Sequence, residues 1–224
     1  METVIAIGVV AVLLTGFLAV FTPAAQGIRR SISSQQANRL TSTLERELVT
    51  LREDQPPLNI NTGFEKAFAW IQNGDTAATA IFVYQYRGES TSLRPDGTPS
   101  PMDDVTGQPG SDYTIQSIAR RADDPELTND LKAIDGAIFY VKPTQLVYTG
   151  NEMVLGTPGE IVDPKTAAPA ATADAFQDAV IAFSAEFYSV PSKSSKYLTD
   201  PTKFAARFDS AKKPVFTRNL AIRR

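Results

Sequence analysis

The side chains that most enzymes use for nucleophilic and acid–base chemistry are scarce in this chain. It contains no histidine and no cysteine, which removes the commonest general base and the thiolate nucleophile. Ser210 and Lys213 have the Ser-x-x-Lys spacing that can place a hydroxyl nucleophile beside a lysine base. The companion motifs of that enzyme class are absent, and a four-residue pattern arises easily by chance. We therefore interpret this segment as a solvated turn, and we expect no enzyme activity and no cofactor.

An acidic cluster offers a second kind of chemistry, oxygen ligands for a metal ion. Asp123, Asp124 and Glu126 lie around Pro125, and Asp130 follows them. Calcium takes ligands of this type, but the spacing is not that of an EF-hand loop. We expect an exposed acidic loop without a metal, and calcium binding is the alternative.

A single carboxylate, Glu2, stands before a run over residues 4–21 that contains no charged side chain. As a helix this run is about 27 Å long, close to the roughly 30 Å hydrocarbon core of a bilayer. We predict a transmembrane or filament-core helix over residues 1–27. A cleavable signal peptide is the alternative, but it usually has a basic n-region, and the charge before this run is acidic.

The charges after the run bear on topology. Arg29 and Arg30 follow it closely, and by the positive-inside rule they would leave the rest of the chain in the cytoplasm. The rule would not apply if a basic leader preceded Met1 and was removed, and we keep both possibilities.

The helix is predicted to continue as an amphipathic segment over residues 28–55. One face carries a stripe at helical spacing, formed by Leu40, Leu44, Leu48 and Leu51. Prolines at 56 and 57 are expected to end the helix, because proline and the residue before it resist helical geometry. Leucines with this spacing usually lie in a core, so we expect the stripe to pack on a globular head.

The succession of these parts resembles type IV pilins and the pseudopilins of type II secretion systems. The likeness lies in ETVIAIGVVAVLL and in the amphipathic stretch after it, and it covers residues 2–53. It implies a bacterial protein that is held in the inner membrane and then polymerises, with itself and with other pilin-like subunits, into a cell-surface or periplasmic filament. It also implies that Glu2 neutralises the N-terminal amine of a neighbouring subunit and so fixes the axial register. The alternative is that Glu2 lies in the lipid headgroup layer beside its own amine.

Residues 56–224 are predicted to form an α+β head with a mainly antiparallel sheet and loops near 88–112 and 156–173. One helix is expected in FEKAFAWIQNGD, and a second from the helical spacing of Phe176, Val180, Phe183 and Phe187. The expected strands are residues 80–87, 113–121, 137–141, 145–148, 152–155 and 214–222.

Two further groups of side chains have ordinary explanations. Trp70 and the face formed by Tyr84 and Tyr86 are expected in the core rather than in a ligand platform. A basic end is formed by Lys212, Lys213, Arg218, Arg223 and Arg224. Such charges commonly guard an edge strand, and an inter-subunit contact is the alternative. The net charge of −3 and the lack of a basic stripe with aromatics argue against nucleic acid.

The sequence therefore favours a structural, pilin-like subunit. A single-pass anchored binding protein that does not polymerise is the second hypothesis, and an anchored enzyme is the third. A basic leader ending in glycine, encoded upstream, would favour the first over the second.

Overall fold

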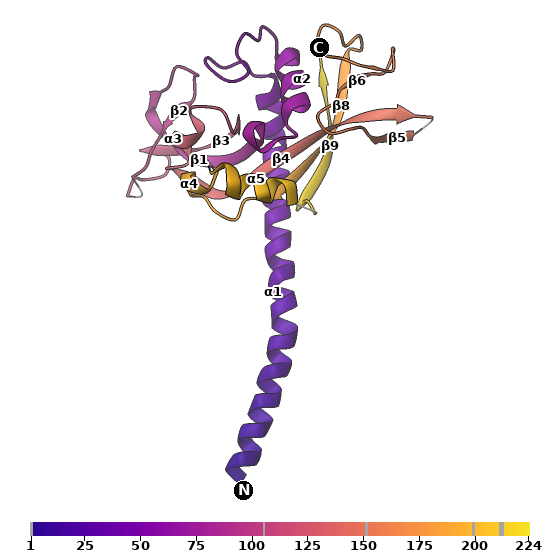
Figure 1. The fold of residues 1–224 in the computed structure, drawn as a ribbon. Coiled ribbons are helices and arrows are strands. Elements are labelled where there is room, and N and C mark those ends of the chain that lie inside the picture. Colours follow the sequence, from indigo (N-terminus) through magenta and orange to yellow (C-terminus); the bar gives the residue numbers. More distant parts are fainter. Residues whose placement is uncertain (1, 105, 151, 199, 211–212) are drawn as a thin grey trace.

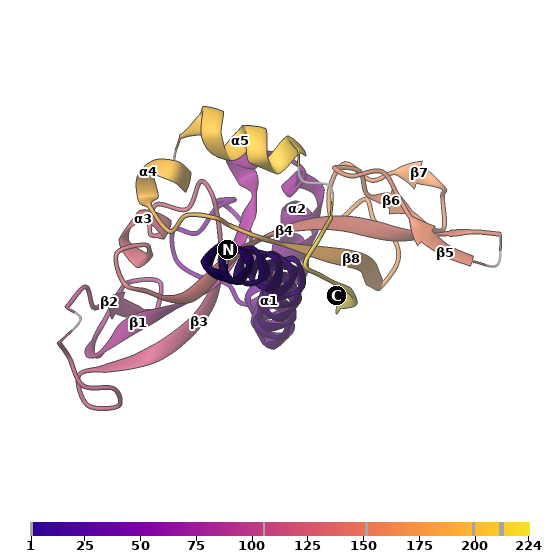
Figure 2. The same ribbon diagram turned by 90° about the horizontal axis from the view of Figure 1, so that it is seen from below.

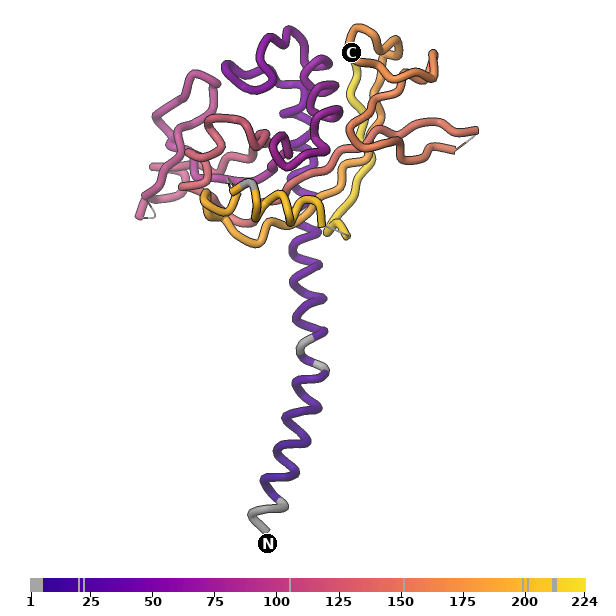
Figure 3. The backbone as a smooth tube through the Cα atoms, viewed as in Figure 1, coloured from indigo at the N-terminus to yellow at the C-terminus, as the bar shows by residue number. Residues whose placement is uncertain are grey.

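A long helix dominates the computed structural model, which describes residues 2–104, 106–150, 152–198, 200–210 and 213–224. This helix, α1 (Glu2–Val49), has 48 residues and is about 72 Å long at 1.5 Å per residue. It continues through Pro23 and Gly27 without interruption. Its first half projects alone, and its second half runs into the head, as Figures 1 and 3 show.

The predicted end of this helix near residue 55 is wrong by several residues, because α1 ends at Val49. Side chains replace the helical hydrogen bonds beyond that point. Arg52 turns back to form an ion pair with Glu47, and the amine of Lys66 donates to the carbonyl oxygen of Thr50. The connection to the next helix is therefore irregular and held by polar contacts.

The head, residues 56–224, is α+β as predicted and is built on a mainly antiparallel sheet of seven strands. The main strands run in the order β3–β1–β4–β8–β9, while β2 pairs with the outer part of β1 and β5 with the outer part of β4. A separate two-stranded ribbon is formed by β6 and β7. The strands are β1 (Ile81–Leu93), β2 (Pro99–Pro101), β3 (Tyr113–Arg121), β4 (Ile134–Thr149), β5 (Glu152–Leu155), β6 (Val162–Asp163), β7 (Ala168–Pro169), β8 (Val180–Ser189) and β9 (Phe216–Arg223).

Helices cover both faces of this sheet, as the end-on view of α1 in Figure 2 shows. Strand β1 alternates between two cores, with Ile81 and Val83 in one and Phe82, Tyr84 and Tyr86 in the other. The first core also contains side chains of α1 and α2, and the second those of α4 and α5. The helices after α1 are α2 (Gly63–Asn73), the short η1 (Ala77–Thr79), α3 (Leu127–Asp130), α4 (Ser195–Leu198) and α5 (Pro201–Ser210).

The second predicted helix is wrong, because residues 180–189 form strand β8. Phe183 and Phe187 fit a helical period, but with Ile181 and Ala185 they also fit a period of two, and these four side chains share one core. Since β8 pairs with β4 on one side and β9 on the other, it is a central strand with both faces covered. Such strands carry apolar residues on both faces and are easily mistaken for helices.

Two predicted strands, 137–141 and 145–148, are one continuous strand, β4. Pro143 lies between the two predicted segments, and proline cannot donate to a ladder. Pairing of β4 with β1 ends at Val141, and pairing with β5 begins at Leu146. Pro143 therefore lies between these two paired stretches, where neither β1 nor β5 is placed to accept a hydrogen bond from a backbone nitrogen.

The two predicted loops are also more ordered than expected. Residues 88–112 include the end of β1 and all of β2, and residues 156–173 include the β6–β7 ribbon. The amphipathic helix α5 was not predicted. Its Phe204 and Phe208 are buried, and both ring centroids lie within 6 Å of that of Tyr140, at 5.5 and 5.4 Å.

Candidate assembly helix and its anchorage in the head

The first half of α1 presents apolar side chains to the surroundings. Among the described residues, α1 is the helix that is long and apolar enough to cross a membrane, with a mean hydropathy of 2.2 and 0% burial in its most apolar window. A membrane anchor and a signal sequence share this property. Soluble monomers rarely expose a continuous apolar surface of this size. Side chains that are at least half exposed include Ile7, Val9, Val10, Val12, Leu13, Leu14, Phe17, Phe21, Ile28 and Ile32.

The residue expected to set the filament register, Glu2, is the first residue of α1. Its side chain lies outside the part of the chain that the structure describes.

The second half of α1 is anchored by the leucine stripe. Leu40, Leu44 and Leu48 are 4%, 1% and 1% exposed and lie in the core shared with α2 and the sheet. Leu51 does not belong to this stripe, because α1 ends before it and its side chain is 47% exposed. The helical spacing that placed it on the same face does not apply beyond Val49.

A buried ion pair reinforces this anchorage. The carboxylate of Glu47 is fully buried, and Arg52 donates to both of its oxygens at 2.8 Å. The same arginine donates to the carbonyl oxygen of Asp96 at 3.1 Å, and Arg46 donates to that of Ser117 at 3.0 Å. Charged side chains of α1 and its exit are thereby tied to the head around β2 and β3.

The acidic cluster is not an exposed loop. Asp124 and Asp130 are 5% and 0% exposed, and Arg120 donates to them at 3.0 and 2.7 Å and to Asp96 at 2.7 Å. Arg94 donates to Glu126 at 2.8 Å. We call the following six residues the charge network: Arg94, Asp96, Arg120, Asp124, Glu126 and Asp130. Two guanidinium groups neutralise the oxygens that a metal would need, and no group of acidic residues suited to a metal occurs among the described residues.

Hydrogen bonds also shift the titration of this network. Burial alone would raise the pKa of Asp96, but hydrogen bonds from Thr98 and Arg120 outweigh it and lower that pKa to about 2. Tyr84 donates to Asp130 at 2.7 Å, and burial with the nearby negative charge raises the pKa of the phenol. Asp130 Oδ1 lies 2.8 Å from Arg94 Nη1 at an angle that makes no hydrogen bond.

The charge network continues into the connection after α1. Gln55 donates to Asp124 at 3.3 Å and accepts from Lys66. Lys66 is 3% exposed, which the sequence did not suggest. The available signal was its place among Phe64, Ala67, Phe68 and Trp70 in α2, where no complete polar face remains.

Ser210 and the described residues of the basic end are exposed. Ser210 ends α5, is exposed and bonds the carbonyl oxygen of Arg207 at 3.4 Å. Lys213 is exposed, and Lys212 lies outside the described residues. Arg218 donates to Asn38 of α1 at 3.3 Å, joining the outermost main strand to the helix.

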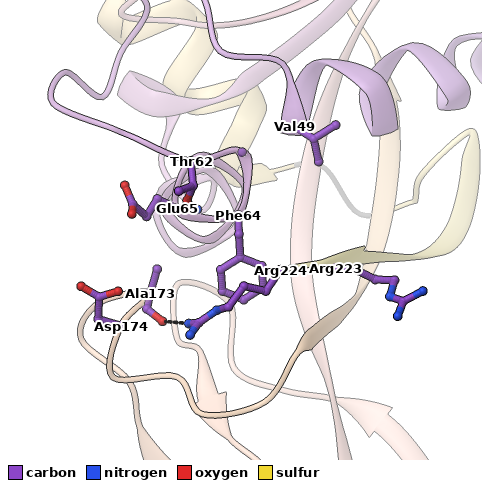
Figure 4. Close-up of a pocket in the computed structure, with 9 residues that line it drawn as sticks. Val49, Thr62, Phe64, Glu65, Ala173, Asp174, Arg223 and Arg224 are labelled. Carbon is purple, nitrogen blue, oxygen red and sulfur yellow. Dashed lines mark hydrogen bonds between the residues drawn. The ribbon is translucent and has the colours of Figure 1, made fainter.

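A cavity of about 410 Å³ lies where the N-terminal end of α2 meets the chain end (Figure 4). Arg224 forms one wall, with its guanidinium 4.7 Å from the ring centroid of Phe64 and donating to the carbonyl oxygens of Ala173 and Phe176. The lining mixes carboxylates and guanidiniums without a nucleophile beside a base. It is formed by Val49, Thr62, Gly63, Phe64, Glu65, Ala173, Asp174, Arg223 and Arg224.

Comparison with known proteins gives no match. No protein-family model, curated protein or solved structure is detectably similar to this chain.

Proposed function

We propose that this chain is a structural subunit that is held in a bacterial inner membrane and polymerises through α1 into a type IV pilus-like or pseudopilus-like filament. The observation that carries the proposal is the division of α1 into two halves. One half exposes apolar side chains, and the other is locked into the head by Leu40, Leu44 and Leu48. An uninterrupted helix joins them.

The division has a physical consequence for where the chain is stable. Each large apolar side chain transferred out of water contributes about 1.5–3 kcal/mol. The exposed half of α1 therefore requires lipid or other apolar helices around it. In a filament, bundled copies of this half would bury one another's apolar side chains. The heads, with net charge and polar loops, would remain in water.

The second hypothesis is a single-pass anchored binding protein that does not polymerise. The cavity beside Arg224 favours it, because a ligand site needs a concavity of about this size. Its lining includes two carboxylates and two guanidiniums, and Arg224 is already engaged with Phe64 and with backbone carbonyl oxygens, so we rank this hypothesis below the filament subunit.

The experiment that separates the two hypotheses is the isolation of surface or periplasmic filaments from cells that produce the chain. We expect electron microscopy to show filaments whose repeating unit is this chain, identified by mass spectrometry and antibody labelling. A chain found only in the membrane fraction, with no filament containing it, would favour the anchored binding protein.

A further inference from the structure

Lys66 is a buried amine in direct contact with a carboxamide. Its Nζ lies 2.5 Å from Oε1 of Gln55 and 2.5 Å from the carbonyl oxygen of Thr50. The ring centroid of Trp70 is 4.7 Å away. Since a C=O bond is about 1.2 Å long, Nζ is at most about 3.7 Å from the carbonyl carbon of Gln55. Nζ donates to the oxygen in this contact, so it must turn toward the carbon and close to about 3–3.5 Å before a bond can form.

The other end of the same carboxamide contacts a carboxylate. Gln55 is 8% exposed, and its Nε2 donates to Asp124 at 3.3 Å. Arg120 fixes Asp124 at 3.0 Å. The carboxamide is thus held between an amine at its oxygen and a carboxylate at its nitrogen.

Burial favours the neutral form of this amine, which nucleophilic attack requires. Burial lowers the pKa of Lys66 from its usual 10.5 to about 7. Glu47 and Asp124 raise this pKa, and Arg52 and Arg120 lower it, so the neighbouring charges partly cancel. A large fraction of the side chain is a neutral amine near neutral pH, and the neutral amine is the nucleophile.

We propose that Lys66 and Gln55 join in an intramolecular amide cross-link. Nζ of Lys66 attacks Cδ of Gln55, and the new C–N bond forms as the carbonyl π electrons move to oxygen. Both nitrogens are then bonded to Cδ, and Asp124, which already accepts a hydrogen bond from Nε2, takes a proton from the former Nζ and delivers it to Nε2. The Cδ–Nε2 bond then breaks, and ammonia leaves. Asp124 returns as a carboxylate, and the exchange of one amide for another needs no oxidant, reductant or cofactor.

The cross-link would close residues 55–66 into a ring. That ring fixes the exit of α1 onto α2, next to the ion pair of Glu47 and Arg52. A covalent closure of this kind restricts the unfolded chain and raises the unfolding temperature. The inference rests on the contacts of the head and does not depend on filament formation.

The test is the intact mass of the purified full-length chain in detergent, followed over time at several pH values. We expect the chain to become lighter than its sequence by one ammonia, with a rate that rises through about pH 7 as the amine loses its proton. Trypsin should fail to cut after Lys66. Chymotryptic cleavage after Leu58 should leave the two halves of the ring joined.

Matched variants assign the chemistry. Gln55→Glu keeps the shape and can pair with Lys66. A carboxylic acid could condense with the amine only by losing water, so this variant should show no loss of ammonia. Lys66→Met should behave in the same way, and Asp124→Asn should slow the reaction at least tenfold. Gln72→Glu, which changes a half-buried glutamine elsewhere on α2, should still lose ammonia at the wild-type rate.

Two outcomes would overturn the proposal. One is a wild-type chain of full sequence mass at pH 8, with Lys66 open to an amine reagent after unfolding. The other is ammonia loss that persists in Lys66→Met, because the ammonia would then come from a different side chain.

Discussion

The most consequential residue of the head is Arg120, which is buried with 1% of its surface exposed. It donates to Asp96, Asp124 and Asp130. A buried ion pair adds little to stability compared with a well-packed apolar core, but removal of one partner leaves uncompensated charge. The charge network is therefore a structural element in which single substitutions have large effects.

Arg120→Met should destabilise the head by about 3–5 kcal/mol, because buried carboxylates lose their partner. Urea unfolding followed by the fluorescence of Trp70 measures this free energy. Arg223→Met, at an exposed position, is the control and should change stability by less than about 0.5 kcal/mol. A loss below about 1 kcal/mol for Arg120→Met would show that water or protonation compensates the carboxylates.

At the scale of elements, the distinction between the two halves of α1 depends on a few leucines. Leu44 is buried in the shared core, whereas Leu51 lies past the helix end and is 47% exposed. Leu44→Ala should cost about 2–5 kcal/mol, since it leaves a cavity between α1 and α2. Leu51→Ala removes the same atoms and should cost less than about 1 kcal/mol. Equal losses in thermal or urea unfolding would mean that the α1–head contact contributes little.

The elements also show what the sequence could and could not predict. The strand over 113–121 and the helix around Phe64 and Phe68 were predicted because their periodicity and end signals are local. Strand β8 was not, since its residues satisfy two periods and only pairing with β4 and β9 decides between them. The partners of the acidic residues were missed for a similar reason. Arg94 comes from the turn between β1 and β2, far away in the chain. Arg120 is close in the sequence, but its burial at the end of β3 depends on the packing of the sheet.

At the scale of the whole molecule, the exposed half of α1 is separate from the two cores of the head, in which the first α1 residue is Ala37. Removal of residues 1–27 should therefore leave a soluble α+β head that unfolds cooperatively on heating. Calorimetry and circular dichroism of residues 28–224 measure this. An aggregated product, or one without a cooperative transition, would show that the apolar half is needed to fold the head.

The last prediction concerns how whole molecules associate. In a filament the apolar halves of α1 would lie against one another away from water, and a carboxylate there requires a cationic partner. Glu2→Ala should therefore leave membrane insertion intact or slightly improved, because a charge is lost from the end of the apolar run. Filament assembly should fall sharply, because the N-terminal amine of a neighbouring subunit would lose its partner.

Glu2→Gln keeps the size without the charge and should assemble poorly too, whereas Glu160→Gln, at an exposed position of the head, should assemble normally. Membrane fractionation and a count of surface filaments give both quantities for each variant. Wild-type filament numbers from Glu2→Ala would remove the register role, and the single-pass anchored protein would then be the better hypothesis.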